Sequence, residues 1–244
     1  MNIRSAIKKL VPPILWDLLR SNPARHQANF DLPVITLEEI IGDLTVVSAR
    51  VVASQIERSK SMVLPLADLL SVASICQARV PKQIFEIGTY TGSTTLVMAQ
   101  NLPTQTKIFT LDLDPADLPA FLIGKDGKPV YEAGVIFKSS RDKDRICQLF
   151  GDSSAFDFTP YQGKMDLVFV DADHSYDAVL RDSKTAISLL APGGIVIWDD
   201  YRWLPEHSEC SGVTRALNSL AARYPIRQLD GTRLAICLPG ANTN

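Results

Sequence analysis

From Gln83 to the end of the chain, short β-branched or aromatic runs alternate with longer amphipathic segments. This alternation is the pattern of parallel strands connected by helices. The predicted strands are residues 83–87, 107–112, 146–150, 165–171 and 194–198, and the predicted helices are residues 93–101, 174–190 and 213–224. Residues 117–144 form an irregular insertion, with a turn at Lys125-Asp126-Gly127-Lys128. The pattern predicts an α/β fold with a parallel sheet.

The two ends of the chain add elements to this sheet. Asp230-Gly231 separates two apolar runs, residues 226–229 and 233–238, which is a strong hairpin signal. The sheet is therefore predicted to be seven-stranded and mostly parallel, with a C-terminal antiparallel hairpin. Residues 37–78 predict two or three helices before the sheet begins. We expect an N-terminal helical extension over residues 1–80 and the main domain over residues 81–240.

Composition limits the classes of partner and compartment. The chain has 244 residues, 46% of them hydrophobic, and a formal net charge of -2, which is typical of a globular protein and does not favour nucleic-acid binding. The four cysteines are far apart in the sequence, so we expect them to be reduced and mostly buried. A cytoplasmic location is expected, because no apolar run is long enough to span a membrane and no secretory signal is recognisable.

The first segment, residues 1–20, places apolar side chains at helical spacing beside basic ones. An amphipathic helix of this kind can lie on an anionic membrane surface or pack against protein. We favour packing against its own domain or a second subunit, which makes a homodimer a hypothesis and stable membrane insertion an unfavoured alternative.

The turn after the first predicted strand carries the first functional signal. It reads Glu86-Ile87-Gly88-Thr89-Tyr90-Thr91-Gly92-Ser93. The two glycines permit a tight turn and close approach of a ligand. A carboxylate beside the turn suits a ligand with an ammonium and a sulfonium better than a pyrophosphate. The GxGxxG spacing of nicotinamide-binding turns is absent, which disfavours a nicotinamide oxidoreductase.

The ends of the next two strands supply further polar groups. Asp112 ends the second strand about twenty residues beyond the glycine turn, where an acidic residue can bind ribose hydroxyls. Asp152 and Ser153 follow the third strand and are placed to contact an adenine. Turn-stabilising polar residues are the alternative explanation for this pair.

Four aspartates follow the fourth and fifth strands. Asp171 and Asp173 lie after one strand, and Asp199 and Asp200 after the other. Adjacent strands are only about 4.8 Å apart, so these carboxylates would repel one another unless a cation joined them. Oxygen ligands favour magnesium or another hard divalent cation. We predict Asp171, Asp199 and Asp200 as metal ligands.

In order along the chain, EIGTYTGST, FTLDLDP, GDSS, MDLVFVDADHSY and APGGIVIWDDY closely resemble the successive motifs of class I S-adenosylmethionine-dependent methyltransferases. The resemblance covers roughly residues 83–238 and implies a Rossmann-like fold. It implies that Asp112 holds the ribose, that Asp152 and Ser153 hold the adenine, and that Asp171 also borders the cofactor. The methionine end would be held by Glu86, Gly88, Thr89, Tyr90, Gly92 and Ser93.

Within this superfamily the aspartates are similar to those of metal-dependent O-methyltransferases of the catechol and macrocin-like types. The catechol type has an Asp-Asn pair after the fifth strand, whereas this chain has Asp-Asp, as in the enzymes that methylate sugar hydroxyls. The resemblance therefore favours a small-molecule acceptor with a sugar or other aliphatic hydroxyl. A metal-bound hydroxyl loses its proton more easily, and Asp173 is the predicted general base, with His174 able to share the role.

Two further expectations remain open. The loop over residues 201–211 carries Arg202, Trp203, His207 and Glu209, a composition suited to gripping a polar ring. The alternative to an enzyme is a non-catalytic methyltransferase-fold subunit that serves as a scaffold or partner, because a fold alone does not establish chemistry.

Overall fold

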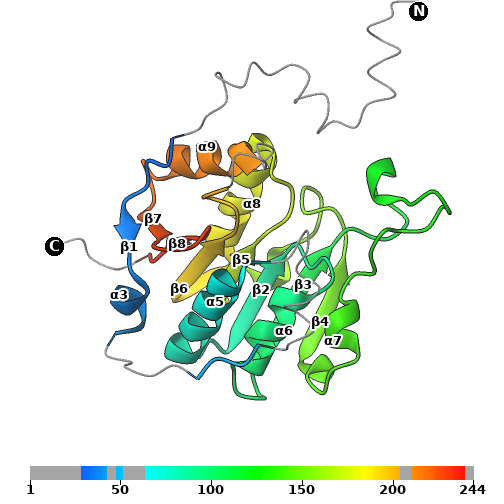
Figure 1. The fold of residues 1–244 in the computed structure, drawn as a ribbon, viewed down its shortest axis with the longest axis horizontal. Coiled ribbons are helices and arrows are strands. Elements are labelled where there is room, and N and C mark those ends of the chain that lie inside the picture. The colour runs from blue at the N-terminus through cyan, green and yellow to red at the C-terminus, as the bar shows by residue number, and fades with distance from the viewer. Residues whose placement is uncertain (1–28, 43–47, 52–63, 204–209, 240–244) are drawn as a thin grey trace, which may run out of the picture.

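The computed structural model describes residues 29–42, 48–51, 64–203 and 210–239. Its centre is a sheet of eight strands in the order β1-β7-β8-β6-β5-β2-β3-β4 (Figure 1). The strands are β1 Val34–Ile35, β2 Gln83–Ile87, β3 Lys107–Asp112, β4 Ile146–Phe150, β5 Met165–Val170, β6 Leu190–Trp198, β7 Ile226–Leu229 and β8 Ala235–Cys237. All neighbouring strands pair in parallel except β6 with β8 and β8 with β7. The Rossmann-like architecture with a C-terminal hairpin is confirmed.

Helices cover both faces of the sheet. On one face lie α3 Leu37–Ile41, α5 Leu66–Arg79, α6 Ser93–Gln100 and the short α7 Val135–Lys138, whose buried side chains form one core with the strands. On the other face, α8 Tyr176–Leu189 and α9 Ser211–Leu220 form a second core with the sheet. Within the described residues, no helix combines the length and hydrophobicity needed to cross a bilayer.

Differences from the sequence prediction occur where local chemistry sets an element's boundary. The eighth strand, β1, has two residues and is held by β7, whose Gln228 N–H donates to the carbonyl of Pro33. Two residues carry no periodicity that a sequence could reveal. Helix α8 begins at Tyr176 instead of residue 174 because Ser175 adopts an extended cap conformation and its N–H donates to the Asp173 carboxylate.

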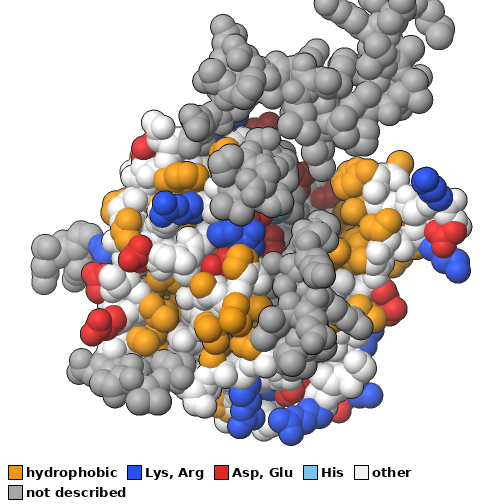
Figure 2. Space-filling model, viewed as in Figure 1, with side chains coloured by type: hydrophobic (Ala, Val, Ile, Leu, Met, Phe, Trp, Pro, Cys, Tyr) orange, Lys and Arg blue, Asp and Glu red, His pale blue; other side chains and the backbone are white. Residues whose placement is uncertain are grey.

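The insertion over residues 117–144 contains the predicted turn. Gly127 has a φ of +76°, the N–H of Lys128 donates to the Asp126 carboxylate, and an isolated bridge joins Ile123 to Pro129. The part of the insertion around this turn projects from the body in Figure 1, and Figure 2 shows apolar side chains on it with charged side chains at its tip. The insertion also contains α7, which the sequence analysis did not predict.

Several expectations fall on residues outside the described ranges. They are the amphipathic helix over residues 1–20, and His207 and Glu209 of the loop. Three of the four cysteines are buried and free, as expected, whereas Cys147 is exposed. The domain division at residue 80 and a homodimer stay predictions, although α5 shares its core with the sheet strands.

Candidate active site

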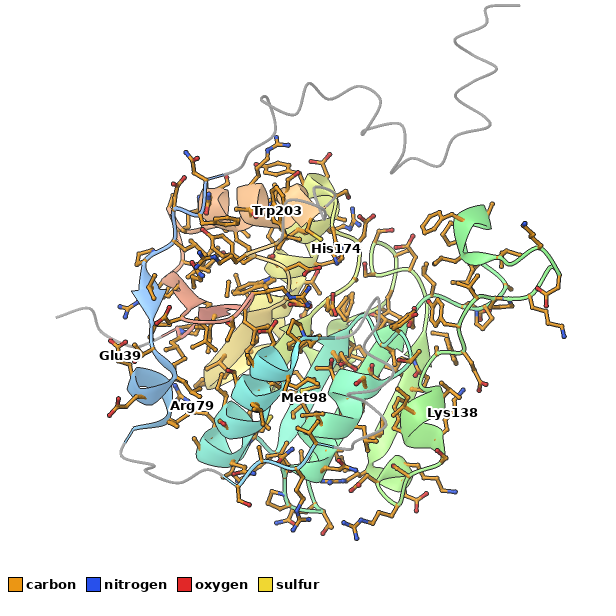
Figure 3. The ribbon with its side chains drawn as sticks, viewed as in Figure 1. Glu39, Arg79, Met98, Lys138, His174 and Trp203 are labelled. Atoms are coloured by element: carbon orange, nitrogen blue, oxygen red, sulfur yellow. The ribbon has the colours of Figure 1, made fainter. Side chains whose placement is uncertain are left out.

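The register of the central strands brings the predicted site residues to one edge of the sheet. Ile87 pairs with Val170, and Val170 pairs with Trp198, so β2, β5 and β6 end in one row. The residue after each of these strands is Gly88, Asp171 or Asp199. Ligands bind beyond the carboxyl ends of strands in sheets of this type, and this rim is therefore the candidate active site. Figure 3 labels His174 at this rim.

The glycine turn between β2 and α6 fits closely against the loop after β5. Gly88 has a φ of +101°, and a Cβ atom added there would lie 1.8 Å from the backbone oxygen of Asp171. Gly92 has a φ of +82°, and a Cβ there would lie 2.4 Å from the Phe137 ring. Only glycine satisfies both the conformation and the space at these positions. The turn thus keeps its backbone against the rim.

Glu86 lies inside the protein, below this turn. Its side chain is 1% exposed, and its Oε2 accepts hydrogen bonds of 2.5 Å from the hydroxyls of Thr95 and Thr110. Burial raises the pKa of Glu86 to about 8, against the hydrogen bonds from the two threonines, which lower it. The carboxyl therefore connects β2, β3 and α6, and its contact with a ligand stays a prediction.

A pH-dependent stability difference is expected between wild type and Glu86→Gln. The folded-state pKa of about 8 exceeds the ordinary value of 4.5, so folding favours the protonated carboxyl, and its contribution is lost as the pH rises from about 4.5 to about 8. The glutamine side chain keeps the shape without the titration. The free energy of unfolding of wild type, relative to the variant, should fall by a few kcal/mol between pH 5 and pH 8.

Urea unfolding at the two pH values measures this difference. Glu132→Gln is the matched control, because Glu132 has a side-chain exposure of 65% and should give a constant difference. A Glu86→Gln difference that also stays constant would show that Glu86 is ionised in the folded protein.

Asp112 is saturated with hydrogen bonds at the end of β3. Its Oδ2 accepts the Tyr90 N–H at 2.6 Å, and its Oδ1 accepts the Leu113 N–H at 2.8 Å and the Tyr131 hydroxyl at 2.9 Å. The Thr89 N–H also contributes a hydrogen bond to this carboxyl. Burial is the main reason that the pKa of Asp112 is raised. Tyr131 comes from the insertion and packs against Tyr90 with ring centroids 4.7 Å apart.

Beside the glycine turn, the Thr89 hydroxyl lies 2.6 Å from the Thr110 hydroxyl, and Ser93 is the buried first residue of α6. After β4, Asp152 is exposed and its Oδ1 accepts the Ser154 N–H at 2.7 Å. That hydrogen bond is the main cause that lowers the pKa of Asp152. Asp152 thus forms a local turn, and an adenine contact by Asp152 and Ser153 stays a prediction.

Three of the four predicted rim aspartates come together. Carboxylate oxygens of Asp171, Asp199 and Asp200 lie within 4.8 Å of one another. Burial, followed by the negative charges of Asp171 and Asp200, raises the pKa of Asp199 well above its ordinary value. The Oδ1 atom of Asp199 is buried and has no hydrogen-bond partner within the described ranges. A buried acceptor without a donor, facing two other carboxylates, fits a divalent cation.

Asp173 and His174 occupy different positions at this rim. Asp173 is exposed, and its Oδ1 accepts the Ser175 N–H at 2.7 Å. The imidazole Nε2 of His174 lies 3.5 Å from Asp171 and 3.4 Å from Asp200. Burial lowers the pKa of His174, but the adjacent carboxylates outweigh burial and place this pKa well above its ordinary value.

Residues that the sequence analysis did not predict also contribute to the rim. The Cys210 thiol lies 3.2 Å from Asp200 and 3.6 Å from His174, and Arg233 pairs with Asp199 and Asp200. Arg233 is placed by the hairpin: Ala235 pairs with Trp198 of β6, so a side chain two residues earlier reaches the residues that follow β6. The hairpin signal, extended to its register, could have indicated Arg233. Cys210 and Tyr131 had no signal in the sequence.

Comparison with known proteins agrees with this geometry. The sequence profile of a family described as "Methyltransferase domain" matches residues 85–201. This part of the chain is therefore similar to methyltransferase domains. The matched region begins in β2 and ends just after Asp199 and Asp200, and therefore contains the glycine turn and all four rim aspartates.

Proteins similar to this part of the chain include O-methyltransferases. The caffeoyl-CoA O-methyltransferase of Stellaria longipes is 30% identical over 125 residues, which is 50% of this chain and 47% of that protein. The chain thus spans about half the length of the curated relatives it matches. An SAH-bound methyltransferase of Podospora anserina has a TM-score of 0.57 and 20% identity, over 77% of this chain and 88% of that one. A SAM-bound O-methyltransferase of Streptomyces achromogenes has a TM-score of 0.55 and 16% identity, over 79% and 92%.

Proposed function

We propose that the chain is an S-adenosylmethionine-dependent O-methyltransferase acting on a hydroxyl of a small molecule. The observation that carries this proposal is the convergence of Asp171, Asp199 and Asp200 directly beside the Gly88 turn, with a buried Asp199 oxygen that lacks a donor among the described residues. The methyltransferase-domain match and the O-methyltransferase relatives support it.

The cofactor would lie along the rim from the glycine turn toward β4. The turn over residues 88–93 would hold the methionine end, Asp112 the ribose hydroxyls, and Asp152 with Ser153 the adenine, while Asp171 borders the reacting centre. Neighbours of the same fold were solved with SAM or SAH, which supports this cofactor for the chain. The residues after β2, β3 and β4 would thus contact the methionine end, the ribose and the adenine of the cofactor, respectively.

Tyr131 is expected to compete with the ribose. A carboxylate offers about four acceptor positions, and Asp112 already accepts from Tyr131 and three backbone N–H groups. Ribose hydroxyls must therefore displace the Tyr131 hydroxyl. Tyr131→Phe should bind S-adenosylmethionine about three- to tenfold more tightly by calorimetry, since about 1 kcal/mol of competing hydrogen bond is removed.

Tyr161→Phe is the control for Tyr131→Phe. It removes the same hydroxyl from an aromatic cluster around Phe85 and should leave the affinity unchanged. Weaker binding by Tyr131→Phe would mean that the Tyr131 hydroxyl contacts the cofactor instead of competing with it.

Asp171, Asp199 and Asp200 would hold a divalent metal, with Mg²⁺ as the expected ion. When bound, such an ion lowers the pKa of an acceptor hydroxyl and fixes its oxygen. The chain's own residues would do the rest: the glycine turn presents the sulfonium methyl, and the rim excludes water and aligns oxygen, carbon and sulfur. Asp173 and His174 are the proposed groups that take the proton. The imidazole of His174 contacts two of the three carboxylates, and because these raise its pKa and favour its protonated form, His174 could take the proton only after a bound cation offsets their charge.

The acceptor is proposed to be a sugar or natural-product hydroxyl in preference to a catechol. The Asp199-Asp200 pair supports this preference, since the catechol type carries Asp-Asn. The curated relatives are named for caffeoyl-CoA, so an acyl-CoA phenol belongs in the same panel of acceptors as catechols and sugar-bearing compounds.

Calorimetric titration of S-adenosylmethionine, with and without Mg²⁺, followed by methylation assays on that panel, tests the function. Cofactor binding together with Mg²⁺-dependent methylation is the expected result. Methylation that does not depend on metal would support the proposed methyltransferase function and overturn the proposed metal site. No binding of S-adenosylmethionine would favour the scaffold alternative, and binding of NAD in its place would favour an oxidoreductase.

A further inference from the structure

Arg233 joins three carboxylates from two separate parts of the fold, helix α5 and the segment after β6. Its Nε lies 3.2 Å from Asp68 in the first turn of α5, its Nη2 lies 3.0 Å from Asp199, and its Nη1 lies 2.9 Å from Asp200. The backbone N–H of Arg233 donates to the second Asp68 oxygen at 3.3 Å. Asp68 is 1% exposed. The buried Asp68 carboxylate thus binds the Nε and the backbone N–H of Arg233, while the two Nη atoms contact the two aspartates after β6.

The contacts divide the oxygens of these two aspartates into two sets. Arg233 contacts Oδ2 of Asp199 and Oδ1 of Asp200. The other Asp199 oxygen, Oδ1, is buried without a hydrogen-bond partner among the described residues. The other Asp200 oxygen, Oδ2, faces Cys210 and His174. The Asp199 Oδ1 atom therefore remains for a ligand, whereas Asp200 Oδ2 could bind one only beside or in place of its contacts with Cys210 and His174.

We propose that Arg233, anchored by Asp68, is a positioning residue that orients the Asp199 and Asp200 carboxylates toward the metal. This inference rests on the proposed metal site and adds to it two residues outside the matched methyltransferase-domain segment, residues 85–201. Outer groups that orient metal ligands commonly change metal affinity about 10- to 100-fold when they are removed.

An orienting role and a purely electrostatic role of Arg233 predict opposite changes in metal affinity when the arginine is removed. If the arginine acted only through its charge, its removal would leave a more negative site that attracts a cation more strongly. If it acts by orientation, its removal frees two mutually repelling carboxylates and weakens binding. Lysine keeps the charge but has a single ammonium in place of the planar fork that contacts two carboxylates at once.

The test is the affinity for Mn²⁺, measured from the electron paramagnetic resonance signal of the free ion, in wild type, Arg233→Met and Arg233→Lys. Arg233→Met is expected to bind Mn²⁺ about 10- to 100-fold more weakly, and lysine is expected not to restore wild-type affinity. Arg227→Met, on strand β7 of the same hairpin, is the matched control and should bind as wild type does. Thermal unfolding without metal identifies the variants that fold.

The outcomes separate this inference from the proposed function. Tighter binding by Arg233→Met, or wild-type binding by a folded Arg233→Lys, would overturn the positioning role and leave the metal site intact. If Arg233→Met fails to fold, Arg233→Lys decides by the same criterion. A wild-type protein that binds no Mn²⁺ would overturn the metal site and this inference together, while binding of S-adenosylmethionine would still report on the methyltransferase.

Discussion

Asp199→Asn is expected to abolish the proposed metal-dependent methyl transfer while making the metal-free protein more stable. The amide keeps the shape of the side chain and can still accept a hydrogen bond from Arg233, which lies 3.0 Å away. The substitution does, however, remove the negative charge of a proposed metal ligand. Loss of a metal that contributes several kcal/mol to the transition state should lower the rate by at least about 1000-fold.

The gain in stability follows from the electrostatics of the buried aspartate. Burial and the charges of Asp171 and Asp200 hold the pKa of Asp199 well above its ordinary value, so the fold favours the neutral form, which Asn imitates. Wild type should lose this contribution as the pH rises through the raised pKa. Without metal, the variant should therefore be more stable by about 1–3 kcal/mol at pH 8, and by less at pH 5.

Thermal and urea unfolding without metal, together with single-turnover methylation, measure the two effects. Asp177→Asn is the matched control, because Asp177 is an exposed residue in the first turn of α8. It should change neither the rate nor the stability appreciably. An Asp199→Asn protein that keeps metal-dependent activity would remove Asp199 from the ligand set, and a metal-free variant less stable than wild type would contradict the electrostatic argument.

Gly88→Ala is expected to disrupt both the fold and the proposed cofactor site. The alanine Cβ would lie 1.8 Å from the Asp171 carbonyl oxygen and 2.5 Å from its carbon. Both are backbone atoms of the loop after β5, so neither can rotate away. The residue would also have to hold a φ of +101°, which is unfavourable for a residue with a Cβ. We expect a loss of more than about 4 kcal/mol of stability, and no cofactor binding by any protein that folds.

Gly127→Ala separates the effect of the unfavourable backbone conformation from the effect of the steric overlap. Gly127 has a φ of +76°, but among the described residues, apart from its two chain neighbours, no atom lies within 4 Å of the position of an added Cβ. This variant should lose only about 1–2 kcal/mol from backbone strain. Soluble expression, urea unfolding and calorimetry with S-adenosylmethionine compare the two variants. A Gly88→Ala protein as stable as Gly127→Ala would show that the loop after β5 can move away from the turn.

The sheet could be predicted because each central strand carries a continuous signal. Strands β2, β3, β4 and β7 begin and end at the residues predicted for them. Their side chains are apolar, β-branched or aromatic, and their ends are marked by glycine or aspartate. The start of α8 depends instead on a hydrogen bond between Ser175 and Asp173, and β1 depends on a partner strand near the opposite end of the sequence. Contacts of this kind are not contained in a local pattern.

The same distinction applies to the rim. Asp171, Asp199 and Asp200 could be predicted to meet because parallel strands end together, and their oxygens do lie close together. Tyr131 and Cys210 could not be predicted, since each arrives from a loop whose path the sequence does not specify. Arg233 is an intermediate case. The Asp230-Gly231 turn predicts the hairpin, but only the pairing of Ala235 with Trp198 places the arginine beside the aspartates.

The backbone at position 200 limits which side chains can complete this rim. Asp200 has a φ of +57°, a left-handed conformation that Asp and Asn tolerate better than other residues with a Cβ. The two residue types that distinguish Asp-Asp from Asp-Asn pairs are therefore the two that fit this conformation most easily. The charge of the rim can change by one unit through the exchange of an oxygen for an NH₂ group, with the chain path unaltered. A single scaffold could thus be tuned to acceptors of different acidity without rebuilding the loop.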